Sequence, residues 1–117
     1  MYKRGDVILC QVPMPSTGLT QSKLRPAIIV SKDLNNQRLS DVMIAPCTSN
    51  TTHQHETTQF LIEGEEIKNS GIRVPSVVKC EAFLTVPKAL ITQQLGQLSP
   101  SARTKLDSCL RDALAVG

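Results

Sequence analysis

The chain has 117 residues, with 40% hydrophobic residues, 20% charged residues and a formal net charge of +3. This length suits a single domain over residues 1–117 and excludes two separate hydrophobic cores, while the composition is typical of an ordinary globular protein. Aromatic residues reach only 3% and Trp is absent, so we expect an aliphatic core and few rings on which nucleic-acid bases could stack. The sequence opens MYKRGDV without a secretory signal and has no apolar stretch that could span a bilayer, so we expect a cytoplasmic location.

Basic charge is concentrated in the first third of the chain. Residues 1–38 carry six basic and two acidic side chains, a net charge of +4, whereas the remainder carries seven basic and eight acidic ones. An anionic partner is therefore expected to meet the first third, although a few solvated lysines would give the same count. The four cysteines form no CxxC pair, and each lies in an apolar run, so we expect reduced, buried thiols, no metal site and no cofactor.

The first half of the chain predicts three strands separated by polar segments. Residues 6–12 are rich in β-forming side chains, residues 25–31 form a continuous aliphatic run typical of a strand buried on both faces, and residues 41–49 supply a third strand. A loop over 13–24 contains two prolines and a glycine, and a loop of that length is often functional. Residues 32–40 are expected to form a turn, and residues 49–58 a second exposed loop.

The second half predicts two more strands and a helix. Strands are expected at 59–62 and 76–86, with a turn or short helical turn between them. Ser99 before Pro100 is a typical helix start, and apolar residues then recur at helical spacing to Leu114, which predicts an amphipathic helix packed on the sheet. The expected fold is mostly β: a small, strongly bent antiparallel barrel with a C-terminal α-helix.

Two polar side chains stand at strand ends, where loops meet the sheet. Arg25 opens the run RPAIIVS, and Thr48 closes the run DVMIAPCTS. A guanidinium makes bidentate hydrogen bonds to phosphate oxygens, and a hydroxyl can donate another, so the pair is suited to hold a phosphate. Each residue also has a plain structural interpretation, Arg25 as a surface residue before a proline and Thr48 as a turn hydroxyl that caps the backbone.

An ordered set of motifs resembles the MazF/PemK toxin family. RGDV at 4–7, LRPAIIVS at 24–31, APCTS at 45–49 and SVVKCEAFLTV at 76–86 follow the order and spacing of that family over nearly the whole chain. The resemblance implies an SH3-like (CcdB/MazF-type) barrel that forms a homodimer. It implies a sequence-specific, metal-independent endoribonuclease toxin that cuts single-stranded mRNA through the 2′-OH, leaving 2′,3′-cyclic phosphate and 5′-OH ends. A cognate MazE-like antitoxin would neutralise it.

The resemblance also implies roles for particular residues. Arg25 and Thr48 match the family's catalytic pair, and further RNA contacts are expected from the two loops at Gly18, Thr20, Gln21, Lys23, Ser49 and His53. His53 and its neighbour His55 are candidates for RNA contact or, less readily, for a metal site, and an exposed polar loop explains them otherwise. Ala82 and Leu84 stand where many members have a glutamine and a basic residue, so the recognised RNA sequence does not transfer from the family.

Two other functions remain open from the sequence. A CcdB-like gyrase poison would share the barrel, but that activity relies on a C-terminal Trp-Gly-Ile, whereas this chain has no Trp and ends LAVG. A non-catalytic RNA-binding module of the same SH3-like fold would need the same cations as a ribonuclease.

Overall fold

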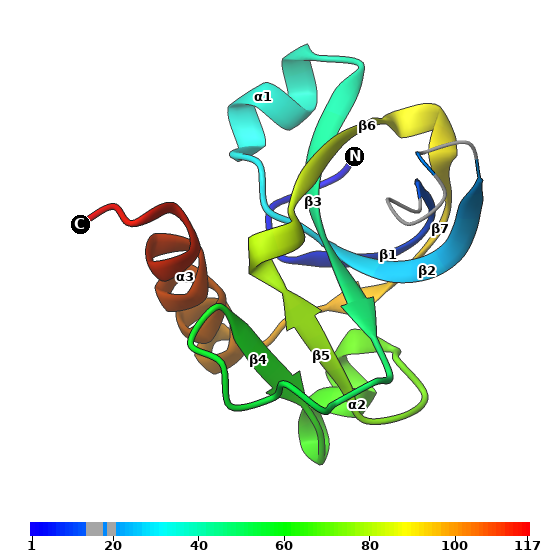
Figure 1. The fold of residues 1–117 in the computed structure, drawn as a ribbon. Coiled ribbons are helices and arrows are strands. Elements are labelled where there is room, and N and C mark those ends of the chain that lie inside the picture. The colour runs from blue at the N-terminus through cyan, green and yellow to red at the C-terminus, as the bar shows by residue number, and fades with distance from the viewer. Residues whose placement is uncertain (14–17, 19–20) are drawn as a thin grey trace.

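The computed structural model describes residues 1–13, 18 and 21–117. The described residues form seven strands, three α-helices and two 3₁₀ turns, and Figure 1 shows the strands and helices arranged around one bent sheet. The strands are β1 (Asp6–Pro13), β2 (Ser22–Ile29), β3 (Asp41–Thr48), β4 (Gln59–Ile62), β5 (Ser76–Lys79), β6 (Leu84–Pro87) and β7 (Ile91–Gln97). The helices are α1 (Asp33–Arg38), α2 (Glu65–Ser70) and α3 (Pro100–Leu114), and the 3₁₀ turns are η2 (Cys80–Ala82) and η3 (Lys88–Leu90).

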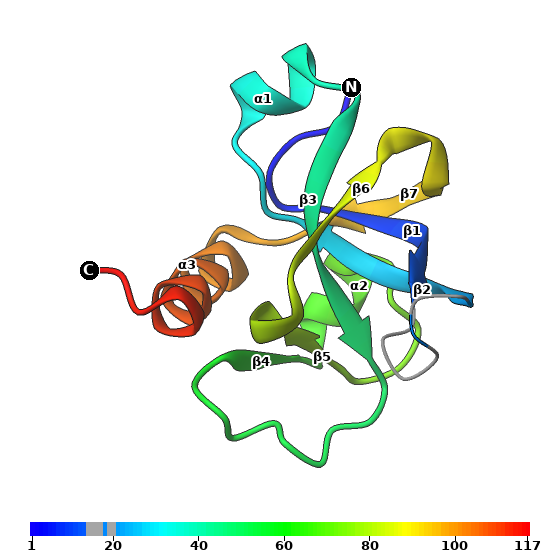
Figure 2. The same cartoon turned by 45° about the horizontal axis from the view of Figure 1, so that its top comes forward.

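All strand pairings are antiparallel, in the order β4-β5-β3-β2-β1-β7, with β6 paired to β3 off this path. The sheet bends strongly, and α3 lies against one side of it, in both Figure 1 and Figure 2. Among the described strands the path begins at β4 and ends at β7, so the barrel is open. The expected mostly-β fold with a C-terminal helix is confirmed.

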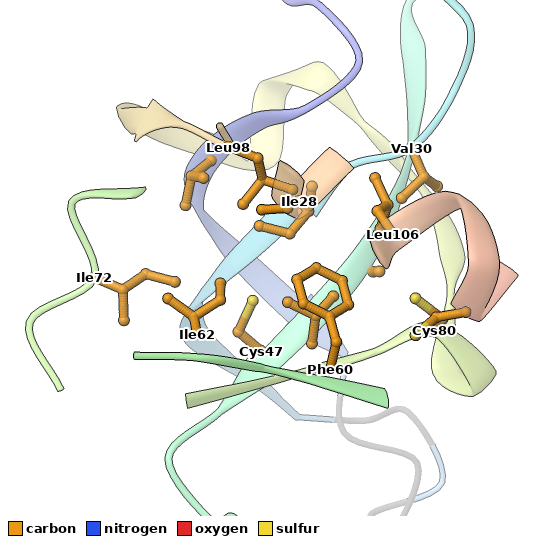
Figure 3. Close-up of a cluster of buried hydrophobic side chains, with 14 residues drawn as sticks. Ile28, Val30, Cys47, Phe60, Ile62, Ile72, Cys80, Leu98 and Leu106 are labelled. Carbon is orange, nitrogen blue, oxygen red and sulfur yellow. The ribbon is translucent and has the colours of Figure 1, made fainter. Parts of the chain in front are cut away.

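The core divides into two clusters on opposite faces of the sheet. Ile28 of β2 belongs to the cluster drawn in Figure 3, which lies under α3. Its neighbours Ala27 and Ile29 belong to the second cluster, which also contains Val42 and Ile44 of β3. Because successive side chains of a strand point to opposite faces, β2 contributes to both clusters. The prediction of a strand buried on both faces is confirmed for this part of β2.

Helix α3 begins where the sequence predicts. The Ser99 hydroxyl accepts a hydrogen bond from the backbone N–H of Ala102 at 3.2 Å and donates one to Glu66 at 2.5 Å, so the first turn of the helix is capped and joined to α2. Ala102, Leu106 and Cys109 are the buried residues of the helix. Arg4 forms an ion pair of 2.7 Å with Asp107, which ties the RGDV segment to this helix.

Three sequence predictions need correction. Residues 32–40 were expected to form a turn, but Asp33–Arg38 is the helix α1. It is held by the buried Asn36 side chain, whose amide nitrogen donates to the Ser31 carbonyl at 2.9 Å. The single strand predicted over 76–86 is interrupted by η2, and the strand β7, which no sequence pattern predicts, pairs with β1. Strand β2 begins at Ser22, inside the segment 13–24 that was expected to be a loop.

The four cysteines are free and buried, as expected. Cys47, Cys80 and Cys109 belong to the cluster under α3. Burial first, and then the neighbouring Cys109 and Glu81, together raise the pKa of the Cys80 thiol to about 12. These thiols stay protonated and pack as small hydrophobic groups. No helix among the described residues is long and apolar enough to cross a bilayer.

Candidate functional site

One hollow in the described part of the structure has a volume of about 670 Å³, which is ample for a nucleotide-sized ligand. It lies at the end of β3, beside β2 and next to η2, and it brings together side chains from five parts of the chain. Thr48 ends its strand as predicted, but Arg25 lies within β2 and not at a strand end, because the pairing with β1 continues to Ser22. Its wall is apolar and its edge is polar. The lining residues are Val12, Pro13, Arg25, Pro46, Cys47, Thr48, Asn50, His53, Gln59, Lys79, Ala82, Phe83 and Leu84.

Arg25 and Thr48 meet because β2 and β3 are neighbours in the sheet. Ala27 of β2 faces Pro46 of β3, and two residues further along each strand stand Arg25 and Thr48. Since side chains alternate along a strand, Arg25 and Thr48 are on the face of the sheet that carries the second core cluster. The sheet thus places a guanidinium and a hydroxyl on one face and in one hollow.

The opposite wall of the hollow comes from an interruption of the strand that follows β5. Ile44 of β3 pairs with Leu84 of β6, and Cys47 of β3 pairs with Val78 of β5. Between these two pairs, β3 advances by three residues, whereas the partner segment spans six. The partner strand therefore contains three extra residues, which is the length of η2. Such insertions push side chains out of the regular pleat and re-aim them. Here the insertion places Ala82 and the two residues after it against the hollow.

Thr48 is oriented by the turn that follows it. Its hydroxyl oxygen accepts a hydrogen bond of 3.1 Å from the backbone N–H of Asn50. The Asn50 side-chain oxygen in turn accepts from the Thr52 backbone N–H at 3.1 Å and from the Thr52 hydroxyl at 2.6 Å. The structural interpretation of Thr48, a turn hydroxyl that caps the backbone, is therefore confirmed. A hydroxyl has one proton besides its acceptor sites, so this bond does not use the Thr48 proton, which can still be donated to a ligand.

Both charged side chains among the described lining residues are cations, Arg25 and Lys79. Neither takes part in the two ion pairs found in the described part of the chain. The nearest acidic residue in sequence, Glu81, accepts hydrogen bonds from Thr58 at 3.0 Å and Gln59 at 2.8 Å. Two cations beside an oriented hydroxyl favour an anionic group, and a phosphate fits this set of donors.

The remaining predicted site residues are distributed unevenly. His53 lines the same hollow as Arg25 and Thr48, whereas His55 lines a second hollow of about 390 Å³ beside α3, so the two histidines do not share a site. Gly18, Gln21, Lys23 and Ser49 are exposed and are not among the residues that line the first hollow, and Thr20 lies outside the described residues. Lys23 pairs across the β1–β2 hairpin with Val12, which lines the first hollow, so Lys23 lies next to the edge of that hollow.

Three polar residues that no sequence pattern singles out also line the hollow: Asn50, Gln59 and Lys79. Lys79 and Gln59 pair with one another across β4 and β5. Thr48 pairs with Val77 of β5, and the side chains of Val77 and Lys79 lie on the same face of the sheet because they are two residues apart. The pairing of β3 with β5 is what places Lys79 and Gln59 in the same hollow as Thr48. In the described residues, no group of three or more His, Cys, Asp or Glu side chains is placed to hold a metal ion.

Comparison with solved structures supports the expected MazF-type fold. A mycobacterial endoribonuclease solved in complex with its cognate antitoxin superposes with a TM-score of 0.80 at 21% identity, covering 100% of this chain and 98% of that one. The Mycobacterium tuberculosis toxin MazF-mt6 superposes with a TM-score of 0.76 at 24% identity, covering 96% of this chain and 98% of that one. At these identities the likeness concerns the fold.

Sequence comparison shows the family. The chain is 26% identical over 116 residues to Endoribonuclease EndoA of Bacillus subtilis, covering 99% of this chain and 97% of that protein. It is 28% identical over 116 residues to Endoribonuclease MazF of Staphylococcus epidermidis, covering 99% and 93%. The family model that matches residues 3–114 describes the PemK-like, MazF-like toxin of type II toxin-antitoxin systems. This match spans nearly the whole chain, and the chain belongs to that toxin family.

Proposed function

We propose that the chain is a sequence-specific endoribonuclease toxin that cleaves single-stranded RNA, with Arg25 and Thr48 holding the scissile phosphate. The observation that carries this proposal is the shared hollow, in which a guanidinium from β2 and a hydroxyl from β3 lie on one face of the sheet beside Lys79. The names of the two relatives, both endoribonucleases, support it.

The chemistry that this set of groups can assist is attack of the RNA 2′-OH on the adjacent phosphorus. The reaction forms a bond from the 2′-oxygen to phosphorus and breaks the bond to the 5′-oxygen, leaving a 2′,3′-cyclic phosphate and a 5′-OH. Negative charge accumulates on the nonbridging oxygens in the transition state. Arg25 offers two parallel N–H donors to those oxygens, and donors aimed at developing charge usually give the largest single catalytic contribution.

Proton transfer needs a second set of groups. The 2′-OH loses a proton as it attacks, and the departing 5′-oxygen gains one. Thr48 can donate its hydroxyl proton to a nonbridging oxygen, because the turn at Asn50 uses only an acceptor site of that hydroxyl. Besides Arg25, the titratable side chains of the hollow are His53, Lys79 and the buried Cys47. Because burial raises the pKa of the Cys47 thiol and keeps it protonated, variants of His53 and Lys79 test which group moves protons.

The partners follow from the same proposal. We infer that a MazE-like antitoxin neutralises the chain by covering the cationic hollow, since one mycobacterial relative was solved with its cognate antitoxin. An acidic segment would complement Arg25 and Lys79. We also infer that the chain is one domain, that it forms a homodimer whose paired barrels extend the RNA groove, and that it acts in the cytoplasm, where its substrate is found.

Cleavage of mixed-sequence RNA in the presence of EDTA tests the activity. We expect fragments with 5′-OH ends and a consistent cut sequence from the unaltered chain, and loss of those fragments in Arg25→Ala and Thr48→Ala. Thr104→Ala serves as a matched control, because Thr104 is an exposed threonine of α3 whose hydroxyl bonds only within the helix. Intact RNA that remains bound would instead favour the non-catalytic module, and inhibition of DNA supercoiling would favour the gyrase poison.

The salt dependence of RNA binding tests the expected contact at Lys23. If Lys23 binds a phosphate, Lys23→Ala should reduce the slope of log affinity against log salt by about 0.7, the value for one phosphate of a single strand. Lys105→Ala is the matched control, because Lys105 lies on α3 beside the second hollow. Equal slopes for the two variants would remove Lys23 from the binding surface.

A further inference from the structure

The three aromatic residues of the chain occupy very different positions. Phe60 is 6% exposed and belongs to the core cluster under α3, where Figure 3 shows it among aliphatic side chains. Tyr2 packs against the second cluster. Phe83 is half-buried and lines the hollow that contains Arg25 and Thr48. Among the described residues, Phe83 therefore supplies the one benzene ring that lines that hollow, where the smaller imidazole of His53 also lies.

The backbone fixes where Phe83 stands. It follows η2 directly, its N–H donates to the Cys80 carbonyl at 3.3 Å, and its φ and ψ of −61° and 148° return the chain to an extended conformation before β6. Cys80 is 0% exposed and anchors the turn in the core. Phe83 is therefore presented by a short, anchored segment, and such a pre-placed ring loses little conformational freedom when a ligand binds.

The surroundings of Phe83 suit a flat, heterocyclic group. The wall around it consists of apolar side chains: Val12, Pro13, Pro46, Ala82 and Leu84. A nucleobase has an apolar face that stacks on an aromatic ring and a polar edge that needs hydrogen-bond partners. The ring and the apolar wall supply the first requirement.

Asn50 supplies the second requirement, a hydrogen-bond partner for the polar edge of a base. Its side-chain oxygen accepts from the Thr52 backbone N–H, and because an N–H can only donate, the assignment of oxygen and nitrogen in this amide is fixed. The Asn50 amide nitrogen is thus the group left to donate, and it suits a carbonyl oxygen or ring nitrogen at the edge of a base. Asn50 also shares the turn that orients Thr48, so a base held there is adjacent to the phosphate site.

We propose that the hollow contains a base-binding subsite in which an unpaired nucleobase stacks on Phe83 and accepts a hydrogen bond from the Asn50 amide, next to the phosphate held by Arg25 and Thr48. This inference rests on the proposed ribonuclease function and adds the group that holds the base. It also explains how a chain with aromatic residues at only 3% can bind single-stranded RNA: one ring is enough if it stands beside the phosphate site.

Fluorine NMR tests the subsite directly, because the chain contains only two phenylalanines and Phe60 is an internal control. The protein is labelled with 4-fluorophenylalanine, and the Phe83→Leu variant assigns the two signals. The probe is a mixed-sequence RNA 12-mer pool with a 2′-O-methyl group on every sugar, which removes the nucleophile. We expect the Phe83 signal to shift on addition of the pool while the Phe60 signal stays in place. An unmoved Phe83 signal at saturation, or equal shifts of both, would overturn the proposal.

Affinity for the same pool gives a second measure. Stacking of one base is worth about 5- to 150-fold in affinity, so Phe83→Ala should weaken binding within that range, whereas Phe83→Tyr, which keeps the ring, should stay within about threefold. Phe83→Tyr also shows that the turn still folds. Equal binding by Phe83→Ala and the unaltered chain would overturn the subsite, as would a Phe83→Tyr variant as weak as Phe83→Ala.

Failure of the subsite and failure of the proposed function are distinguishable, because the pool cannot be cleaved. Cleavage of unmodified RNA with normal pool binding by Phe83→Ala would leave the ribonuclease function intact and reject the subsite. A shifted Phe83 signal in a chain that cuts no RNA would support the subsite and reject the catalytic function.

Discussion

Replacing Arg25 separates its charge from its geometry. Loss of one preorganised donor to a developing negative charge usually costs about 10²- to 10³-fold in kcat. Arg25→Ala removes two donors and a charge, but Lys79 remains in the hollow, so we expect a loss of about 10³-fold. Arg25→Lys keeps the charge without the planar fork, and we expect a loss of about 10²-fold.

The effect on stability should be small, because Arg25 forms no ion pair or hydrogen bond that the described part of the structure would lose. Surface substitutions of this kind stay within about 0.5 kcal/mol, which for a chain of this length corresponds to about 2 °C in Tm. A catalytic loss accompanied by an unchanged Tm therefore assigns the effect to the reaction and not to folding.

The assay is single-turnover cleavage of an RNA containing the mapped cut sequence, with enzyme in excess and EDTA present. Single turnover isolates the bond-breaking step from product release. If Arg25→Lys cleaved as fast as the unaltered chain, the bidentate contact would be refuted. If Arg25→Ala kept full activity, the placement of the phosphate in this hollow would be refuted.

Three further predictions concern the fold. Gly71 has a φ of +73°, and a Cβ there would lie 2.3 Å from the Leu95 carbonyl oxygen. Gly64 has a similar φ of +60°, but a Cβ there would meet open space. Gly71→Ala should therefore lower the free energy of unfolding, measured in urea, more than Gly64→Ala does. Ser99→Ala should lower Tm by about 4–8 °C in a thermal scan, because losing an N-cap costs about 1–2 kcal/mol. Burial raises the pKa of the Cys47 thiol above its usual value of 9.0, so this thiol ionises only when the chain unfolds. The free energy of unfolding should therefore fall as the pH rises past about 9, and it should fall less in Cys47→Val.

Elements specified by local signals could be predicted from the sequence. Helix α3 was predicted from Ser99, Pro100 and the spacing of apolar residues, all within the helix itself. Strand β7 carries no such signal, because Thr92, Gln93 and Gln94 are exposed and the strand is defined by its pairing with β1. Helix α1 is short, and its buried Asn36 side chain bonds to the Ser31 carbonyl five residues earlier, an interaction that hydrophobic periodicity does not report.

The same division applies to the candidate site. Arg25 and Thr48 could be singled out because each stands at the end of an apolar run, and the β2–β3 register brings them together. Lys79 and Phe83 could not, because they lie within a segment that has the composition of one uninterrupted strand. Their positions depend on the extra residues of η2, and only the pairing of β3 with both β5 and β6 shows that insertion.

The η2 insertion has a consequence for how such toxins can change their target. Strands β5 and β6 each keep their own pairing with β3, so the sheet does not depend on the side chains carried by the turn between them. Cys80 must stay apolar because it is 0% exposed, and Glu81 holds Thr58 and Gln59 by hydrogen bonds, so the freedom to vary falls to the half-buried Ala82 and Phe83. Under the proposed function, the phosphate site on β2 and β3 would remain the same. Exchange of two residues in one short turn would then alter the RNA that is chosen, while Arg25 and Thr48 stay in place.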